Sequence, residues 1–186
     1  LLMRTLLPEM IARRAGRVIC ISAVAARMTL PFLSAYSVGK AALNKLVAKV
    51  PAAKALNGTA VAVLVFPSIT KAGFVVGGQY GEGVLWRGGK AVGYYSTTGA
   101  SYGLQAGAQK YGYAMFLMNE NALNALTTAE GFEVGIGPSV VLVDEGMAKS
   151  VTTTTAQNDI YAFIFGQTGL MAGVGIQGNK ITRIDK

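Results

Sequence analysis

The chain has 186 residues, of which 52% are hydrophobic, and a formal net charge of +8. This length suits one domain, or one domain with an appendage, and the hydrophobic content excludes a disordered protein. With no histidine and a single cysteine, the chain cannot form an internal disulfide, a zinc site of Cys and His, or a catalytic triad that contains His. No apolar run reaches the roughly 18 residues of a membrane-spanning helix, so we expect no transmembrane segment.

The positive charge is concentrated at the start of the chain. Residues 1–56 hold nine of the 17 Lys and Arg residues but one of the nine Asp and Glu residues. A basic segment on an otherwise neutral body is typical of attraction to an anionic surface, either lipid or nucleic acid. A solvated helical face explains the same count, and the charge alone does not decide between the two interpretations.

The first forty residues predict a helix, a strand and a second helix. Apolar residues from Met3 to Ile11 follow helical spacing, interrupted at Pro8, and Gly16 ends that helix before a short buried strand at 17–22. The basic cluster at 13–17 and the apolar stretch after it imitate a signal peptide. That stretch is short and lies far into the chain, so we interpret it as a strand and find no convincing signal peptide.

The next motif is Tyr36-Ser-Val-Gly-Lys40, which places a tyrosine and a lysine on one face of a helix. Together with the helix and strand before it, the motif makes residues 1–46 resemble a fragment of a short-chain dehydrogenase/reductase. The resemblance implies a remnant NAD(P)-dependent oxidoreductase that uses Tyr36 and Lys40. However, Ala23 stands where that family has its catalytic Ser, and no glycine-rich strand–turn–helix comes before it in the sequence. We therefore expect no enzymatic activity and no cofactor.

Beyond residue 41 the pattern changes to a helix followed by many short strands. An apolar stripe at Leu43, Leu46, Val47 and Val50 predicts a helix that Pro51 ends or kinks. Residues 52–56 predict another turn, Asn57-Gly58 a reversal of the chain, and residues 60–66 a buried strand that Pro67 ends. Lys45 and Lys49 lie together on another side of the helix.

The remainder predicts an antiparallel sheet with a helix at its side. Strands are expected near 72–79, 82–87, 91–97, 100–108, 111–118, 132–137, 139–144, 159–166, 170–176 and 180–184. A helix is expected at 121–128 with Asn119 as its cap, and hairpin turns at 87–90 and 177–180. The predicted fold class is α+β: mainly an antiparallel sheet of many short, glycine-rich strands with a few helices, after a helix–strand–helix N-terminal segment.

Several glycine-rich blocks recur in order along this body. They include Lys71-Ala-Gly-Phe-Val-Val-Gly-Gly78, Tyr80-Gly-Glu-Gly-Val84, Tyr102-Gly-Leu-Gln-Ala-Gly107 and Gly169-Leu-Met-Ala-Gly173. Through these blocks residues 41–186 resemble the SYLF domain, in its bacterial, envelope-associated branch. The resemblance implies a module that binds acidic membrane lipids, often phosphoinositides, in the bacterial envelope or periplasm. Eukaryotic members also bind actin, which we do not expect here. We divide the chain into a dehydrogenase-like appendage, 1–40, and a SYLF-like domain, 41–186.

Four lysines are the candidate lipid contacts, because they gather in sequence around the helix and the first strand: Lys45, Lys49, Lys54 and Lys71. Each lysine close to an anionic membrane contributes about 1 kcal/mol. A solvated basic face remains the alternative interpretation. The acids Glu82, Glu133, Asp144, Glu145 and Asp159 follow no metal-loop spacing, so we interpret them as surface residues and predict no metal site. The expected partners are acidic lipids, not nucleic acid.

Overall fold

The structure is a computed structural model, and it describes residues 31–73, 76–102, 107–128, 131–143, 157–169 and 178–185. The helix expected at 3–11 and the strands expected at 17–22 and 170–176 lie outside these residues. Helices are α2 (Pro31–Lys49), α3 (Pro51–Thr59) and α4 (Glu120–Thr127). Strands are β1 (Ala62–Gly73), β2 (Val76–Arg87), β3 (Lys90–Tyr102), β4 (Gly107–Leu117), β5 (Phe132–Glu133), β6 (Val140–Val143), β7 (Ile160–Gly169) and β8 (Lys180–Ile184).

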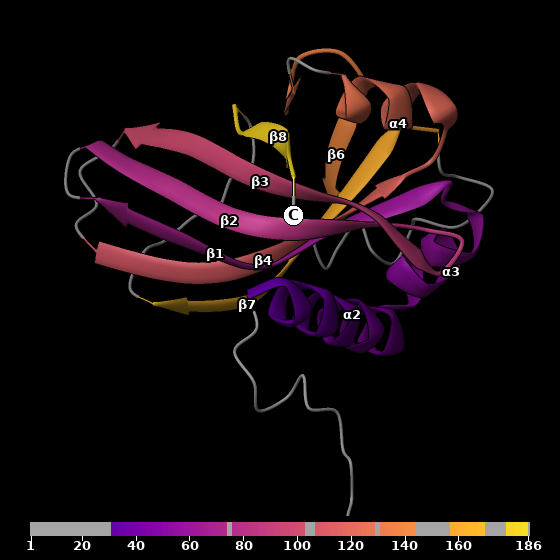
Figure 1. Cartoon of the computed structure of the whole chain (residues 1–186), viewed down its shortest axis with the longest axis horizontal. Helices are drawn as coiled ribbons and strands as arrows, with labels where there is room; N and C mark the ends of the chain where they lie inside the picture. The colour runs from indigo at the N-terminus through magenta and orange to yellow at the C-terminus, as the bar shows by residue number, and fades with distance from the viewer. Residues whose placement is uncertain are drawn as a thin grey trace, which may run out of the picture.

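The described strands form one sheet in the order β5-β8-β3-β2-β1-β4-β7-β6. All neighbouring strands run antiparallel except β6 and β7, which are parallel. Figure 1 shows α2 lying along one side of this curved sheet and α4 on the other. The predicted α+β class with a mainly antiparallel sheet is therefore confirmed. Within the described residues, no helix is long and apolar enough to cross a membrane.

The turn predicted at 87–90 is confirmed as the hairpin between β2 and β3. Gly88 and Gly89 have φ values of 56° and 79°. Residues with a side chain rarely adopt a positive φ, and a two-residue hairpin turn of type I′ needs a positive φ at both central positions. The helix cap is confirmed too: the Oδ1 atom of Asn119 accepts a hydrogen bond of 2.9 Å from the backbone N–H of Ala122.

Pro51 ends the first helix as predicted and begins α3, but two other predicted breaks are wrong. Asn57-Gly58 does not reverse the chain, because both residues lie in the last turn of α3, which Pro51 and the alanines after it begin. The first strand does not end at Pro67 but continues to Gly73 as β1. The pairing of β1 shifts register between Val65 and Ser68, so the proline sits in a bulge where no ladder hydrogen bond is required.

The glycine-rich strands are longer than predicted. The segments expected at 82–87 and 91–97 extend to Val76–Arg87 and Lys90–Tyr102. Tyr80 pairs with Thr70 on one side and Thr98 on the other, so the ladder runs through the point where a break was expected. Pairing on both sides offsets the low strand preference of glycine.

Side chains alternate between two buried layers, one on each face of the sheet. On what we call the α2 face, Val65, Trp86 and Phe116 pack with Leu43 and Leu56 of the two first helices. The opposite side, the α4 face, carries a second cluster of buried side chains from the sheet, from α4 and from the strand that follows it. Its members include Leu64, Phe66, Ile69, Leu85, Tyr95, Tyr111, Tyr113, Met115, Leu123, Leu126, Phe132 and Ile181. The sheet therefore has a core on both of its faces. A surface site must lie on the outward side of the helices that cover the sheet, or at the ends of the strands.

Candidate functional site

Helix α2 turns Lys45 and Lys49 away from the sheet. Leu43 and Leu46 are buried against the α2 face, which confirms the predicted apolar stripe. Lys45 and Lys49, one turn apart, are exposed. Val38 is 51% exposed, and its position two turns before Lys45 places it on the same side of the helix. The outward side of α2 is thus a basic strip with an apolar residue at its beginning.

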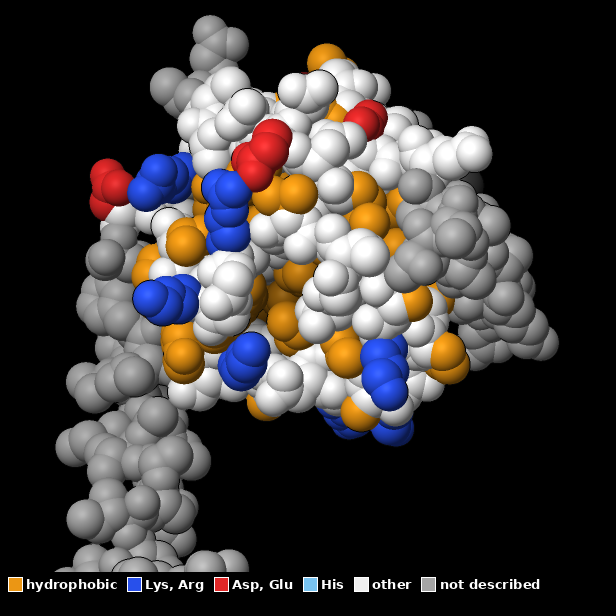
Figure 2. Space-filling model, turned by 90° about the vertical axis from the view of Figure 1, so that its right-hand side faces the viewer, with side chains coloured by type: hydrophobic (Ala, Val, Ile, Leu, Met, Phe, Trp, Pro, Cys, Tyr) orange, Lys and Arg blue, Asp and Glu red, His pale blue; other side chains and the backbone are white. Residues whose placement is uncertain are grey.

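The second helix extends this basic surface. In α3, Ala52, Ala53 and Leu56 are buried and Lys54 is exposed. The sequence from 31 to 59 contains four lysines and no acidic residue, so nothing within these two helices offsets their charge. In Figure 2 the lower half of the face shows Lys and Arg side chains with apolar side chains between them, whereas the coloured Asp and Glu side chains lie above. This combination attracts an anionic surface and offers it apolar contact.

Lys71 lies on the other side of the sheet. It pairs with Gln79 of β2 and Gln109 of β4, and it follows by two residues Ile69, which is buried in the α4-face cluster. Its partly buried side chain therefore belongs to the α4 face. The structure brings Lys45 and Lys49 together, places Lys54 on the adjoining helix, and sets Lys71 apart from all three. Contact of these lysines with lipid stays a prediction.

Tyr36 and Lys40 both contact a residue that sequence reasoning did not connect with them, Trp86 of β2. The two aromatic rings lie 4.8 Å apart at an angle of 47°, and the Lys40 ammonium is 4.8 Å from the centre of the indole ring. Trp86 is 4% exposed, and its Nε1 atom has no hydrogen-bond partner among the described residues. The pair thus seats the beginning of α2 on the sheet. Ala23 lies outside the described residues.

Asp159 joins three parts of the chain. It accepts hydrogen bonds from Asn119 Nδ2 at 2.6 Å and from the backbone N–H and hydroxyl of Ser139 at 2.8 and 2.9 Å. These bonds, that of Asn119 first, hold the pKa of its carboxyl below the ordinary value. Asp144 and Glu145 lie outside the described residues, within which no cluster of three or more metal-ligating side chains occurs. The role of Asp159 is to fasten β7 to the cap of α4.

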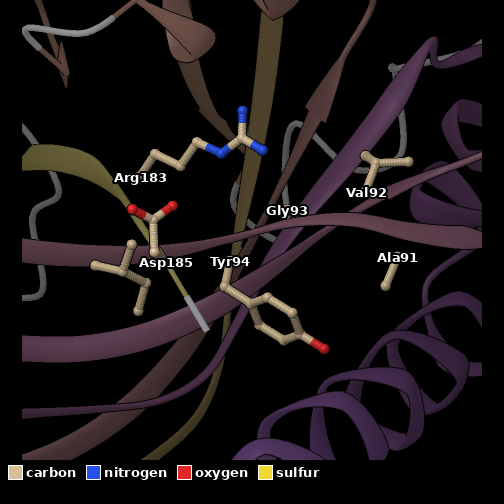
Figure 3. A pocket seen from close by; sticks show the side chains of 7 residues that line it. Ala91, Val92, Gly93, Tyr94, Arg183 and Asp185 are labelled. Carbon is tan, nitrogen blue, oxygen red and sulfur yellow. The ribbon is translucent and has the colours of Figure 1, made fainter.

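A hollow of about 260 Å³ lies between the beginning of β3 and the end of β8. Tyr94, Arg183 and Asp185 are among its lining residues (Figure 3). In this view the Tyr94 ring points toward α2, while the Arg183 side chain points the opposite way. One cation and one carboxylate balance each other here, so the hollow offers an anion much less than the basic strip on α2 does.

Comparison with known families confirms the two partial resemblances. The family model described as Las17-binding protein actin regulator (Ysc84), which is the SYLF domain, matches residues 98–186. The short chain dehydrogenase model matches residues 1–76. No curated protein matches the chain. Each family model covers less than half of the chain, and the division of the chain after residue 40 stays a prediction. Residues 98–186, which begin within β3, are similar to a SYLF domain. Residues 1–76, which include all of β1 and end where β2 begins, are similar to a short chain dehydrogenase.

Proposed function

We propose that this chain is a lipid-binding module that attaches to anionic membrane surfaces through the outward side of α2 and α3. The observation that carries the proposal is the strip of Val38, Lys45 and Lys49 on one side of α2, within a segment that has no acid. Each lysine near an anionic surface contributes about 1 kcal/mol, and an exposed apolar residue adds contact with the acyl boundary. The similarity of residues 98–186 to a SYLF domain supports lipid binding as the class of function.

The lipid is proposed to be an acidic phospholipid with a phosphoinositide-like head group, at a bacterial envelope or periplasmic membrane. The charge of α2 and α3 supports an acidic partner, and the resemblance to the envelope-associated branch of the SYLF family supports the place. The matching family model is named for an actin regulator. We do not extend actin or nucleic-acid binding to this chain.

The chain is proposed not to be an enzyme. The similarity of residues 1–76 to a short chain dehydrogenase supports one alternative function, an oxidoreductase that uses Tyr36 and Lys40. Against it, both side chains are engaged by Trp86, and the sequence has Ala23 where the catalytic hydroxyl belongs. Because the chain has one tryptophan, a titration with NADPH followed by tryptophan emission reports directly on this place. NADPH turnover that disappears in Tyr36→Phe establishes the alternative.

The membrane proposal is tested by co-sedimentation of the full chain with vesicles of neutral phospholipid and of neutral phospholipid mixed with an acidic one. The double substitution Lys45→Gln with Lys49→Gln is expected to weaken binding to acidic vesicles about 30-fold, from about 1 kcal/mol for each lysine. Binding of the unaltered chain should fall as salt rises, because the attraction is screened over about 10 Å at 0.1 M salt.

The matched control removes the same charge from another surface. Lys180 and Arg183 are exposed on β8, away from α2, so Lys180→Gln with Arg183→Gln is expected to leave binding nearly unchanged. Both double variants keep the basic first thirty residues, so any difference between them belongs to α2. Equal weakening in the two variants shows that net charge alone holds the protein at the vesicle, and it refutes the assignment to α2.

A further inference from the structure

Part of the α2 face is left uncovered beyond α2 itself. Gly39 of α2 lies over Val84 of β2, since a Cβ atom built on Gly39 is 3.9 Å from Val84 Cγ2. Because side chains alternate along a strand, Glu82 and Tyr80 lie on the same side as Val84. Glu82 is partly buried and Tyr80 is 52% exposed, so the cover given by α2 ends between them. In Figure 1 one end of each of β1, β2, β3 and β4 extends past α2, at the left.

The residues of this uncovered area are the same on the two sides of Tyr80. Tyr80 pairs with Thr70 of β1 and with Thr98 of β3. One step toward α2, Glu82 pairs with a serine on each side, and one step away from α2, Gly78 pairs with an alanine on each side. All of these residues are exposed except Glu82 and its serine on β3, which are partly buried. We call the nine residues the β2 platform: Ser68, Thr70, Ala72, Gly78, Tyr80, Glu82, Ser96, Thr98 and Ala100.

Tyr80 is held in place on the platform and has open space beside it. Its hydroxyl donates to Oε1 of Glu82 at 3.0 Å, which fixes the ring along β2. Little side-chain freedom is therefore lost when a ligand binds to the ring. On the other side of the ring, a Cβ atom built on Gly78 meets nothing within 4 Å. Glycine and alanine are poor strand formers, so a row of them beside an exposed aromatic ring is more than a solvated sheet surface requires.

The polar groups of the platform restrict the chemistry of a ligand. The oxygens of Thr70, Thr98 and Glu82 all accept hydrogen bonds, so the ligand must bring several donors. The Glu82 carboxylate at the centre repels a phosphate, whereas the exposed Lys110 and Lys180, which pair with the two threonines, repel a cation. A neutral ligand with many hydroxyl groups avoids both penalties. A pyranose sugar carries such hydroxyls at its edge, and the C–H groups on its face are apolar enough to pack on a phenol ring.

The spacing of the strands suits a chain of such sugars. Neighbouring strands are about 5 Å apart, and a linear chain of β-1,4-linked pyranose rings has nearly the same repeat. We propose that the β2 platform binds a soluble, neutral polysaccharide of β-1,4-linked pyranose sugars, with one ring against Tyr80 and the next ring on each side at Thr70 and Thr98. Because the flanking residues are the same on both sides, the platform offers equal groups to the rings before and after the central one. A lipid head group with a single sugar uses only the middle of this surface.

The test is a calorimetric titration of the full chain with cellohexaose, a linear β-1,4-linked glucose hexamer, and with maltohexaose, the α-1,4-linked hexamer of the same composition, which coils. Cellohexaose is expected to bind, and binding is expected to be lost with maltohexaose or with glucose alone. Tyr80→Ala should weaken the binding of cellohexaose about tenfold, because the contact with the ring is removed. Tyr80→Phe keeps the ring and should weaken it less. The matched control, Ile136→Ala, shortens a side chain that is 65% exposed but lies outside the platform, and it should leave the affinity unchanged.

Absence of cellohexaose binding in the unaltered chain, or equal affinity for the two hexamers, overturns the proposal. A folded Tyr80→Ala variant that binds cellohexaose as tightly as Ile136→Ala does also overturns it. Because the ligand is neutral, its affinity should be the same at low and high salt, and a steep fall with salt contradicts a neutral ligand. Tyr80→Ala is expected to co-sediment with acidic vesicles like the unaltered chain. Loss of vesicle binding in this variant assigns the platform to the membrane surface and refutes the polysaccharide.

Discussion

Gly99 of β3 is a position where one added methyl group should damage a buried hydrogen bond, the one that Gln79 donates to Asn179 on the α4 face. A Cβ atom built on Gly99 lies within 2.7 Å of Gln79 Nε2 and closer still to Asn179 Oδ1, the two atoms of a buried hydrogen bond. Neither side chain can retreat without losing that bond, because Tyr111 holds the other end of Gln79. Gly99→Ala must therefore separate the pair or shift β3 away from β8.

The expected cost follows from these two outcomes. Overpacking of a core costs about 1–3 kcal/mol, and a buried polar group that loses its partner costs about 1–3 kcal/mol. We expect a loss of about 3 kcal/mol in the free energy of unfolding, which corresponds to a fall in Tm of about 6–12 °C for a chain of this size. Urea denaturation followed by tryptophan emission measures it.

Gly78 of β2 supplies the matched control. A Cβ built there meets nothing within 4 Å, and its φ is not positive. Gly78→Ala should leave stability unchanged or raise it by about 0.4–1 kcal/mol, because alanine restricts the unfolded chain. The reasoning is refuted if Gly99→Ala costs less than about 1 kcal/mol, or if the two variants lose stability equally.

Three further predictions concern single side chains. Asn119→Ala should lower the free energy of unfolding by about 1 kcal/mol or more, measured in urea, because it removes the cap on Ala122 N–H. The pKa of Tyr111 in the folded protein, about 12, exceeds the ordinary 10.0, so its contribution to stability is present below pH 10 and is lost as the pH rises toward 12. Tyr111→Phe should therefore reduce the loss of stability at alkaline pH, measured by urea denaturation. Lys40→Ala should cost about 1 kcal/mol through its contact with Trp86, and an unchanged urea midpoint contradicts that contact.

Periodicity and turn chemistry were sufficient to predict much of the fold. The stripe that begins at Leu43 predicted α2, Asn119 predicted the cap of α4, and Gly88-Gly89 predicted a hairpin. The end of the strand at Pro67 was wrongly predicted, because Pro67 lies in a bulge where no N–H is needed for pairing. The bulge depends on the pairing of β1 with β2 and β4, which the sequence of one strand does not show. The extension of β2 through its glycines likewise depends on the partners on both sides.

The candidate site was predictable only where it lies on one helix. Helical spacing places Lys45 and Lys49 together, and α2 does so. Lys71 lies near them in sequence, but its side depends on the register of β1 after the bulge, which sets it on the α4 face. The pairing of Lys71 with Gln79 and Gln109 joins residues from three strands, so no local pattern could have predicted it.

Strand β1 links the two partial family resemblances into one structure. It belongs to the part that matches a short chain dehydrogenase, yet it lies in the middle of the sheet, between β2 and β4. Without it, β5, β8, β3 and β2 have no hydrogen-bonded connection to β4, β7 and β6. It also supplies alternate side chains to both cores: Val63 and Val65 face α2, whereas Leu64 and Phe66 face α4. The residues similar to a SYLF domain therefore depend on the dehydrogenase-like part for the centre of their sheet.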